Sequence, residues 1–216
     1  MDWKDLDLKT YGKIYEITSN AFTPEEDKQF KVAALLGGIT YDELLEQPLT
    51  ATTKMVADTA FLYERPKPEF IKREYNLNGR IYTTFKDLSE MTTAQYIDYT
   101  AVVSEKFEEH IVELMSIILI PKGHTYGDGY DREQQMEDLG SLKVTEALGI
   151  ADFFITQYRR LLRRTLLYSK AKLWIAARKL PKELEEEMKA YQKEARETID
   201  ELLTLSGSLS LKRLLD

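Results

Sequence analysis

The pattern of hydrophobic and polar positions changes twice along the chain and divides it into three parts. Up to residue 69, helix start and stop signals enclose short helical runs. Residues 70–86 carry β-branched and aromatic residues on both sides of a turn signal, and helical patterns predominate again from residue 92 to about residue 203. We expect a mostly α (α+β) fold with an N-terminal helical region at 1–69, an inserted β-hairpin at 70–86 and a main helical domain at 87–216, together one compact unit.

Three capping-box patterns mark expected helix starts. Segments 23–26, 40–43 and 92–95 each place a threonine three residues before a glutamate or glutamine, so that side chain and backbone can cap each other. The first of these helices is expected to stop at the glycine pair 37–38, where the chain can adopt positive φ. Residues 50–63 predict a further helix.

The Asn78-Gly79 pair predicts the turn of the hairpin, because both residues tolerate the positive φ angles of a type I′ turn. The flanking runs 70–77 and 80–85 have strand composition. The stretch 11–17 is a candidate third strand.

Two long helices separated by Pro181 are predicted to end the chain as an antiparallel pair, at about 150–179 and 182–203. Short helical pieces at 132–137 and 143–148 are expected before them. On the first long helix, one predicted core stripe consists of Phe154, Tyr158, Leu161, Thr165, Ser169 and Leu173.

The opposite side of this helix mixes cations with large apolar residues: Phe153, Arg159, Arg160, Arg163, Arg164, Leu167, Lys170, Trp174 and Arg178. Protein interfaces favour this mixture, because aromatic residues and arginine contribute much of the binding energy once they are desolvated. A second interpretation stays open. The final helix is acidic and can cover the basic side within the same chain, which would make Phe153 and Trp174 core residues.

Tyrosines outside the helical stripes are further candidate contacts, since a ring with a polar tip suits a half-buried position. They are Tyr11 and Tyr15 in the candidate third strand, Tyr75 and Tyr82 in the hairpin, and Tyr126 and Tyr130 in the long loop 122–131. Local packing over the helices is the alternative for each of them.

Composition narrows the possible functions. Hydrophobic residues make up 43% and charged residues 31% of the chain, as in globular proteins. A net charge of −7 argues against nucleic acid as the main partner, because phosphate binding favours a basic surface. The absence of cysteine excludes disulfides and a thiol nucleophile. The charged first residues do not resemble a secretory signal, and no apolar run is long enough to span a bilayer, so we expect a soluble protein.

No catalytic or cofactor-binding pattern is recognisable in the sequence, and we expect no cofactor. His124, Asp128 and Asp131 share the long loop and offer a minor metal-binding interpretation, although their order does not match an EF-hand. The glycine pair 37–38 lacks the lysine of a phosphate-binding loop. An enzyme stays possible, because an acid–base pair cannot be identified from one sequence.

Segments between about residues 85 and 160 resemble small helical proteins from the structural modules of tailed phages that infect Bacteroidetes, including crAss-like phages. The residues that carry the resemblance are 85–88, 91–98, 117–123, Tyr126, 130–131, 142–147 and 153–154. The resemblance implies a virion protein of the tail or head–tail connector, assembled in the bacterial cytoplasm. It provides no catalytic residues.

This resemblance leads to the hypothesis of a non-enzymatic, ring-forming subunit that packs against copies of itself and against neighbouring portal or tail proteins. It would use no membrane and no specific nucleic-acid binding, though it would line a DNA channel. A tail assembly chaperone is the first alternative and an uncharacterised enzyme the second. The candidate contact residues are Phe153, Arg160, Arg164, Leu167, Trp174, Arg178, Tyr75, Tyr82, Tyr126 and Tyr130.

Overall fold

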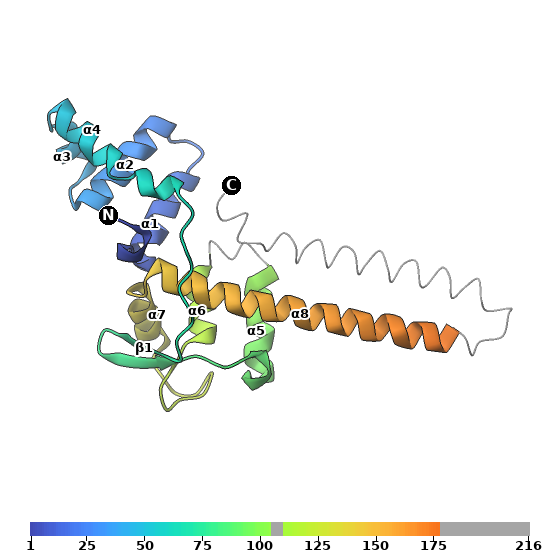
Figure 1. Cartoon of the computed structure of the whole chain (residues 1–216). Coiled ribbons are helices and arrows are strands. Elements are labelled where there is room, and N and C mark those ends of the chain that lie inside the picture. Colours follow the sequence, from blue (N-terminus) through green and yellow to red (C-terminus); the bar gives the residue numbers. More distant parts are fainter. Residues whose placement is uncertain (105–109, 178–216) are drawn as a thin grey trace.

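A computed structural model describes residues 1–104 and 110–177, which form a helical body, a small sheet and one long helix that extends beyond the body (Figure 1). The fold is mostly helical, as predicted, and the sheet in the described residues has three antiparallel strands. In chain order the elements are η1 (Trp3–Asp5), α1 (Leu8–Ser19), α2 (Glu25–Gly37), α3 (Tyr41–Leu45), α4 (Leu49–Ala57), η2 (Ala60–Tyr63), β1 (Glu74–Leu77), β2 (Arg80–Thr83), η3 (Leu88–Glu90), α5 (Thr93–Ser104), α6 (Ile111–Ile118), β3 (Ile120–Pro121), α7 (Arg132–Gly140) and α8 (Val144–Ala177).

Two of the three predicted capping boxes form. At the start of α3, the Thr40 hydroxyl accepts from the Glu43 amide at 3.2 Å, and the Glu43 carboxylate accepts from the Thr40 amide at 2.7 Å. The Gln95 amide donates to the Thr92 hydroxyl at 3.2 Å in the same way. Helix α2 instead has Pro24 at its N-cap without a side-chain cap, so the box expected at residues 23–26 is wrong.

The sheet contains the hairpin β1–β2 and a third strand that differs from the predicted one. Asn78 and Gly79 connect β1 to β2, with φ of 50° and 81°. Residues 11–17 lie inside helix α1, so the expectation of a strand there is wrong. The third strand is β3, which follows the apolar helix α6 and pairs with β2 through Thr83 and Ile120.

Helix α6 lies at the centre of the core. Leu114, Met115 and Ile118 are fully buried there, and α5, α7 and α8 all contact this helix. Two buried glutamine side chains bind its free C-terminal carbonyl groups, which lack partners inside the helix. Gln135 Nε2 donates to the carbonyls of Ser116 at 3.0 Å and Leu119 at 2.8 Å, and Gln95 Nε2 donates to that of Ile117. These bonds fix α5 and α7 against the central helix.

A buried carboxylate, Asp138 of α7, holds the hairpin. It accepts hydrogen bonds from Tyr82 Oη at 2.7 Å, Arg80 Nη1 at 2.9 Å, Asn78 Nδ2 at 3.1 Å and Gln134 Nε2 at 3.2 Å. Burial alone would raise the pKa of Asp138. The hydrogen bonds outweigh this effect and keep its pKa below the ordinary aspartate value.

Helix α8 is continuous from Val144 to Ala177, whereas the sequence predicted a break before residue 150. Its first half is packed in the core, where Phe154 is fully buried. Leu161 is 42% exposed and Thr165 is exposed, so the predicted core stripe is wrong at these two positions, and the side chain of Leu173 lies outside what the structure describes. Helix α8 therefore leaves the hydrophobic core near Leu161. The predicted helix at 182–203 lies outside the described residues.

Within the two described ranges, no helix combines the length and the apolarity that a membrane crossing requires.

Replacing Asp138 with asparagine should destabilise the fold, because the amide cannot accept all the hydrogen bonds of the carboxylate. We expect a loss of about 3 kcal/mol in the free energy of unfolding near neutral pH, measured by chemical denaturation. Glu137→Gln, at the neighbouring exposed position, is the control and should change stability little.

The stabilisation by Asp138 should also depend on pH. Because its folded-state pKa is lowered, the stabilisation is complete above the unfolded value of about 4 and is lost as the pH falls below it. Thermal unfolding between neutral and acidic pH should therefore show a smaller acid-induced drop in Tm for Asp138→Asn than for the wild type. An equal drop in both proteins would contradict this role.

Candidate protein-binding surface

One side of helix α8 carries four of the ten candidate contact residues that the sequence singled out. Phe153, Arg160, Arg164, Leu167 and Tyr168 are separated by the three-, four- and seven-residue steps that place side chains on one side of a helix. We call these five residues the α8 binding face. Its inner part lies in a groove of the body, and its outer part is free of the body, with Leu167 68% and Tyr168 61% exposed.

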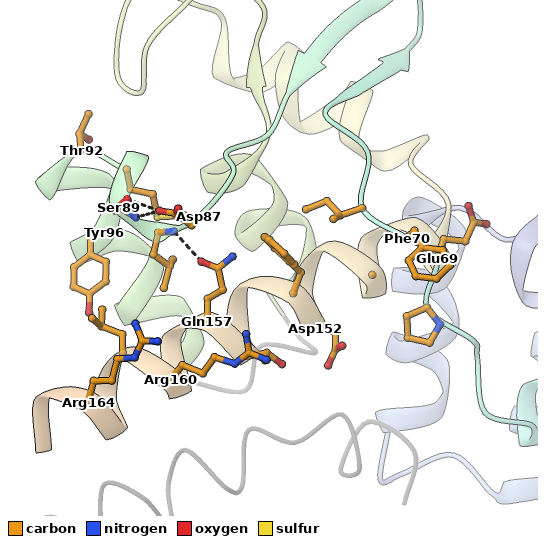
Figure 2. A pocket seen from close by; sticks show the side chains of 18 of the residues that line it. Glu69, Phe70, Asp87, Ser89, Thr92, Tyr96, Asp152, Gln157, Arg160 and Arg164 are labelled. Carbon is orange, nitrogen blue, oxygen red and sulfur yellow. Dashed lines mark hydrogen bonds between the residues drawn. The ribbon is translucent and has the colours of Figure 1, made fainter. Parts of the chain in front are cut away.

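The groove has a volume of about 1100 Å³ and is formed by three chain segments that are far apart in sequence. Its floor is α8 between residues 149 and 164. One wall is the segment 68–71 before the hairpin, and the other is the segment 87–96 after it. Figure 2 shows Glu69 and Phe70 at one end, with Tyr96 and Arg164 at the other.

The wall at 68–71 is fixed to the first turns of α8 by backbone contact. The Glu69 amide donates to the Thr145 carbonyl at 2.9 Å, and the Thr145 hydroxyl donates to the Glu69 carboxylate at 2.9 Å. Gly149 permits this approach, since a Cβ there would lie 2.0 Å from the Glu69 carbonyl oxygen. Lys72 adds an ion pair with Glu146. Phe70 follows at the rim and is almost fully exposed.

The wall at 87–96 is held by the side chain of Gln157 on α8. Gln157 Oε1 accepts from the Leu88 amide at 3.1 Å, and its Nε2 donates to the Lys86 carbonyl at 3.3 Å. Tyr96 packs near Tyr158 with ring centroids 6.4 Å apart. Because the Gln157 amide pairs with both backbone groups, it fixes the position of this wall.

The groove and the exposed part of α8 together offer apolar, aromatic and cationic contacts. Arg160 and Arg164 are both exposed, and no carboxylate in residues 1–104 or 110–177 forms an ion pair with either. Asp152 lies further along the floor (Figure 2). Guanidinium groups next to exposed rings favour an acidic segment of a protein that also carries apolar side chains.

Four of the predicted contact residues are thus brought together, namely Phe153, Arg160, Arg164 and Leu167. Phe153 is half-buried, with its ring edge-on to Phe154 at 5.2 Å between centroids, and it lines the groove. Trp174 belongs to α8, but its side chain lies outside what the structure describes, and Arg178 lies outside the described residues altogether.

The two hairpin tyrosines are corrected from contact residues to core residues. Tyr75 and Tyr82 are both buried. Tyr82 points to Asp138 of α7, and Tyr75 Oη accepts from the Lys72 amide at 2.9 Å. Their polar tips have partners inside the chain, so they are not available to another protein.

The loop tyrosines make contacts within the chain and remain partly accessible. Tyr126 Oη donates to the Asp98 carboxylate at 2.6 Å, and the Tyr130 ring lies 5.8 Å from that of His124. Asp131 caps α7 by accepting from the Gln134 amide at 3.1 Å. In the described part of the chain, no three histidine or carboxylate side chains converge in a way that could hold a metal ion.

Sequence reasoning missed the walls of the groove and Tyr168. Phe70 and Tyr96 have no sequence signal that links them to α8, because only the tertiary fold places them beside it. Tyr168 follows Arg164 by four residues, so helical spacing alone could have added it to the binding face.

Comparisons with protein families, with curated proteins and with solved structures found no match for this chain.

Replacing Gly149 with alanine should displace the wall at 68–71, because the new Cβ would overlap the Glu69 carbonyl. We expect a loss of about 1–3 kcal/mol in stability, measured by denaturant unfolding. Gly12 is the matched control, since it also lies inside a helix but a Cβ added there would meet no atom within 4 Å, and Gly12→Ala should stabilise by about 0.5–1 kcal/mol. Equal effects at both glycines would contradict the close approach.

Proposed function

We propose that this chain is a non-enzymatic assembly protein and, more specifically, a ring-forming structural subunit of a phage tail or head–tail connector. The observation that carries the proposal is the α8 binding face, which continues from the groove onto a part of the helix that extends beyond the body (Figure 1). The phage setting comes from the resemblance of residues 85–160 to phage structural proteins.

The energetics of the exposed residues support a binding role. Leu167 and Tyr168 are large, mostly exposed and adjacent on the helix. Full burial of a side chain of this size against a partner contributes about 1.5–3 kcal/mol. Arg164 lies one turn before Tyr168, and Lys172 lies one turn after it with its Nζ 4.9 Å from the ring centroid. A partner that covers this face gains apolar and electrostatic contacts together.

The ring also requires two different and complementary surfaces on each subunit, because neighbours around a ring meet head to tail. The α8 binding face supplies one such surface. The other must lie elsewhere on the chain. Because a ring is a homo-oligomer, the oligomeric state of the purified chain tests the proposal.

Replacing Leu167 with aspartate should abolish self-association, while the monomer stays folded because this side chain is already exposed. Native mass spectrometry and light scattering on the full chain should show a homo-oligomer for the wild type and smaller species for Leu167→Asp, at similar Tm. Ile97→Asp is the matched control, since Ile97 is 59% exposed on α5 and lies outside the binding face. A monomeric wild-type protein would rule out the ring.

A tail assembly chaperone is the second candidate, and the groove is the observation that favours it. Its volume of about 1100 Å³ and its walls on both sides of α8 suit the binding of a single segment from another protein. A chaperone would be absent from purified particles and bound to an unassembled tail protein. Mass spectrometry of purified virions, with copy numbers, separates it from a ring subunit.

A further inference from the structure

We infer that the partner of the exposed part of α8 is a second copy of this chain, docked through an acidic corner formed by α3 and the start of α4. This inference rests on the proposed function and names the complementary surface that a ring requires. On α8, the residues that contact the corner in this inference are Arg160, Arg164, Leu167 and Tyr168.

The acidic corner consists of Asp42, Leu45, Glu46 and Leu49. All four residues are exposed, and the two leucines are unusually so, at 60% and 78%. Leu45 ends α3 and Leu49 begins α4, and only the exposed residues 46–48 separate the two leucines along the chain. Exposed leucines between carboxylates mark a surface that gains free energy when an apolar and cationic partner covers it.

The two surfaces lie in segments of opposite net charge. Residues 20–64 contain eight acidic residues against three lysines, whereas residues 153–177 contain six arginines or lysines and no acidic residue. Each surface also includes two large exposed apolar residues, Leu167 and Tyr168 on α8 and Leu45 and Leu49 on the corner. Charge complementarity around apolar contacts is the arrangement that gives protein interfaces their specificity.

The two surfaces cannot meet within one subunit. Helices α3 and α4 lie at one end of the molecule, and the far end of α8 lies at the opposite end (Figure 1). Contact between them therefore joins one subunit to the next. Repeated contacts of this kind either close into a ring or continue as a filament, depending on the rotation between neighbours.

Exchange of charges between the two surfaces tests this pairing in the full chain. The first variant carries Arg160→Glu and Arg164→Glu, and the second carries Asp42→Lys and Glu46→Lys. Each variant alone places like charges opposite each other, so its self-association should weaken by about a hundredfold or more. The thermal transition of each variant, measured alongside, should remain cooperative, since all four side chains are exposed.

An equal mixture of the two variants should associate again, because the acidic α8 of the first then meets the basic corner of the second, and the acidic corner of the first meets the basic α8 of the second. Native mass spectrometry should show oligomers in which the two variants alternate. The matched control is Glu133→Lys with Glu137→Lys on α7, which has the same four-residue spacing at exposed positions and should associate as the wild type does.

The outcomes separate this inference from the proposed function. If the wild type associates but the corner variant associates equally well, the corner is not the partner surface, and the ring proposal stands without it. Reversal on α8 that weakens association without rescue in the mixture also overturns the inference. A wild type that stays monomeric overturns both.

Discussion

The hydrogen bonds of the buried Asp138 carboxylate are the interactions on which the geometry of the candidate site depends. The carboxylate binds side chains at both ends of the hairpin turn and in β2, and thereby fixes the hairpin to α7. Both walls of the groove are next to this hairpin in the chain, since the segment 68–71 precedes β1 and the segment 87–96 follows β2. Helix α7 leads within four residues into α8, which forms the floor. The Asp138 carboxylate, stabilised by several hydrogen-bond donors in a low-dielectric position, therefore fixes the position of the two walls relative to the floor.

The walls are then fixed a second time, directly on α8. Gly149 admits the Glu69 backbone on one side, and Gln157 binds backbone groups of the segment 86–88 on the other. These contacts occur within about two turns of one helix. A groove whose walls are positioned by its own floor needs little rearrangement on binding, so less of the interaction free energy is lost to ordering.

The sequence predicted those features that depend on near neighbours. The caps at Thr40 and Thr92 and the Asn78-Gly79 turn involve residues at most three apart, and the mixed face of α8 follows from helical spacing. Features that depend on distant residues were not predictable. The burial of Tyr82 is one of these features. Its partner Asp138 lies 56 positions away in the sequence and comes within hydrogen-bond distance only in the folded chain. The end of the core stripe near Leu161 also depends on where the body ends, which the periodicity of one helix does not encode.

The exposed part of α8 lacks the packing that stabilises most helices in proteins. Most helical stability in proteins comes from packing of an apolar side, and the exposed residues near Leu167 and Tyr168 do not pack on the body. A partner that covers them therefore stabilises the helix as well as the complex, and association and helix stability are linked by mass action. The proposed pairing also separates negative charge at the α3–α4 end from positive charge on α8. In that pairing, the charges would orient two approaching copies head to tail before contact, raising the rate of productive encounters and making that rate sensitive to salt.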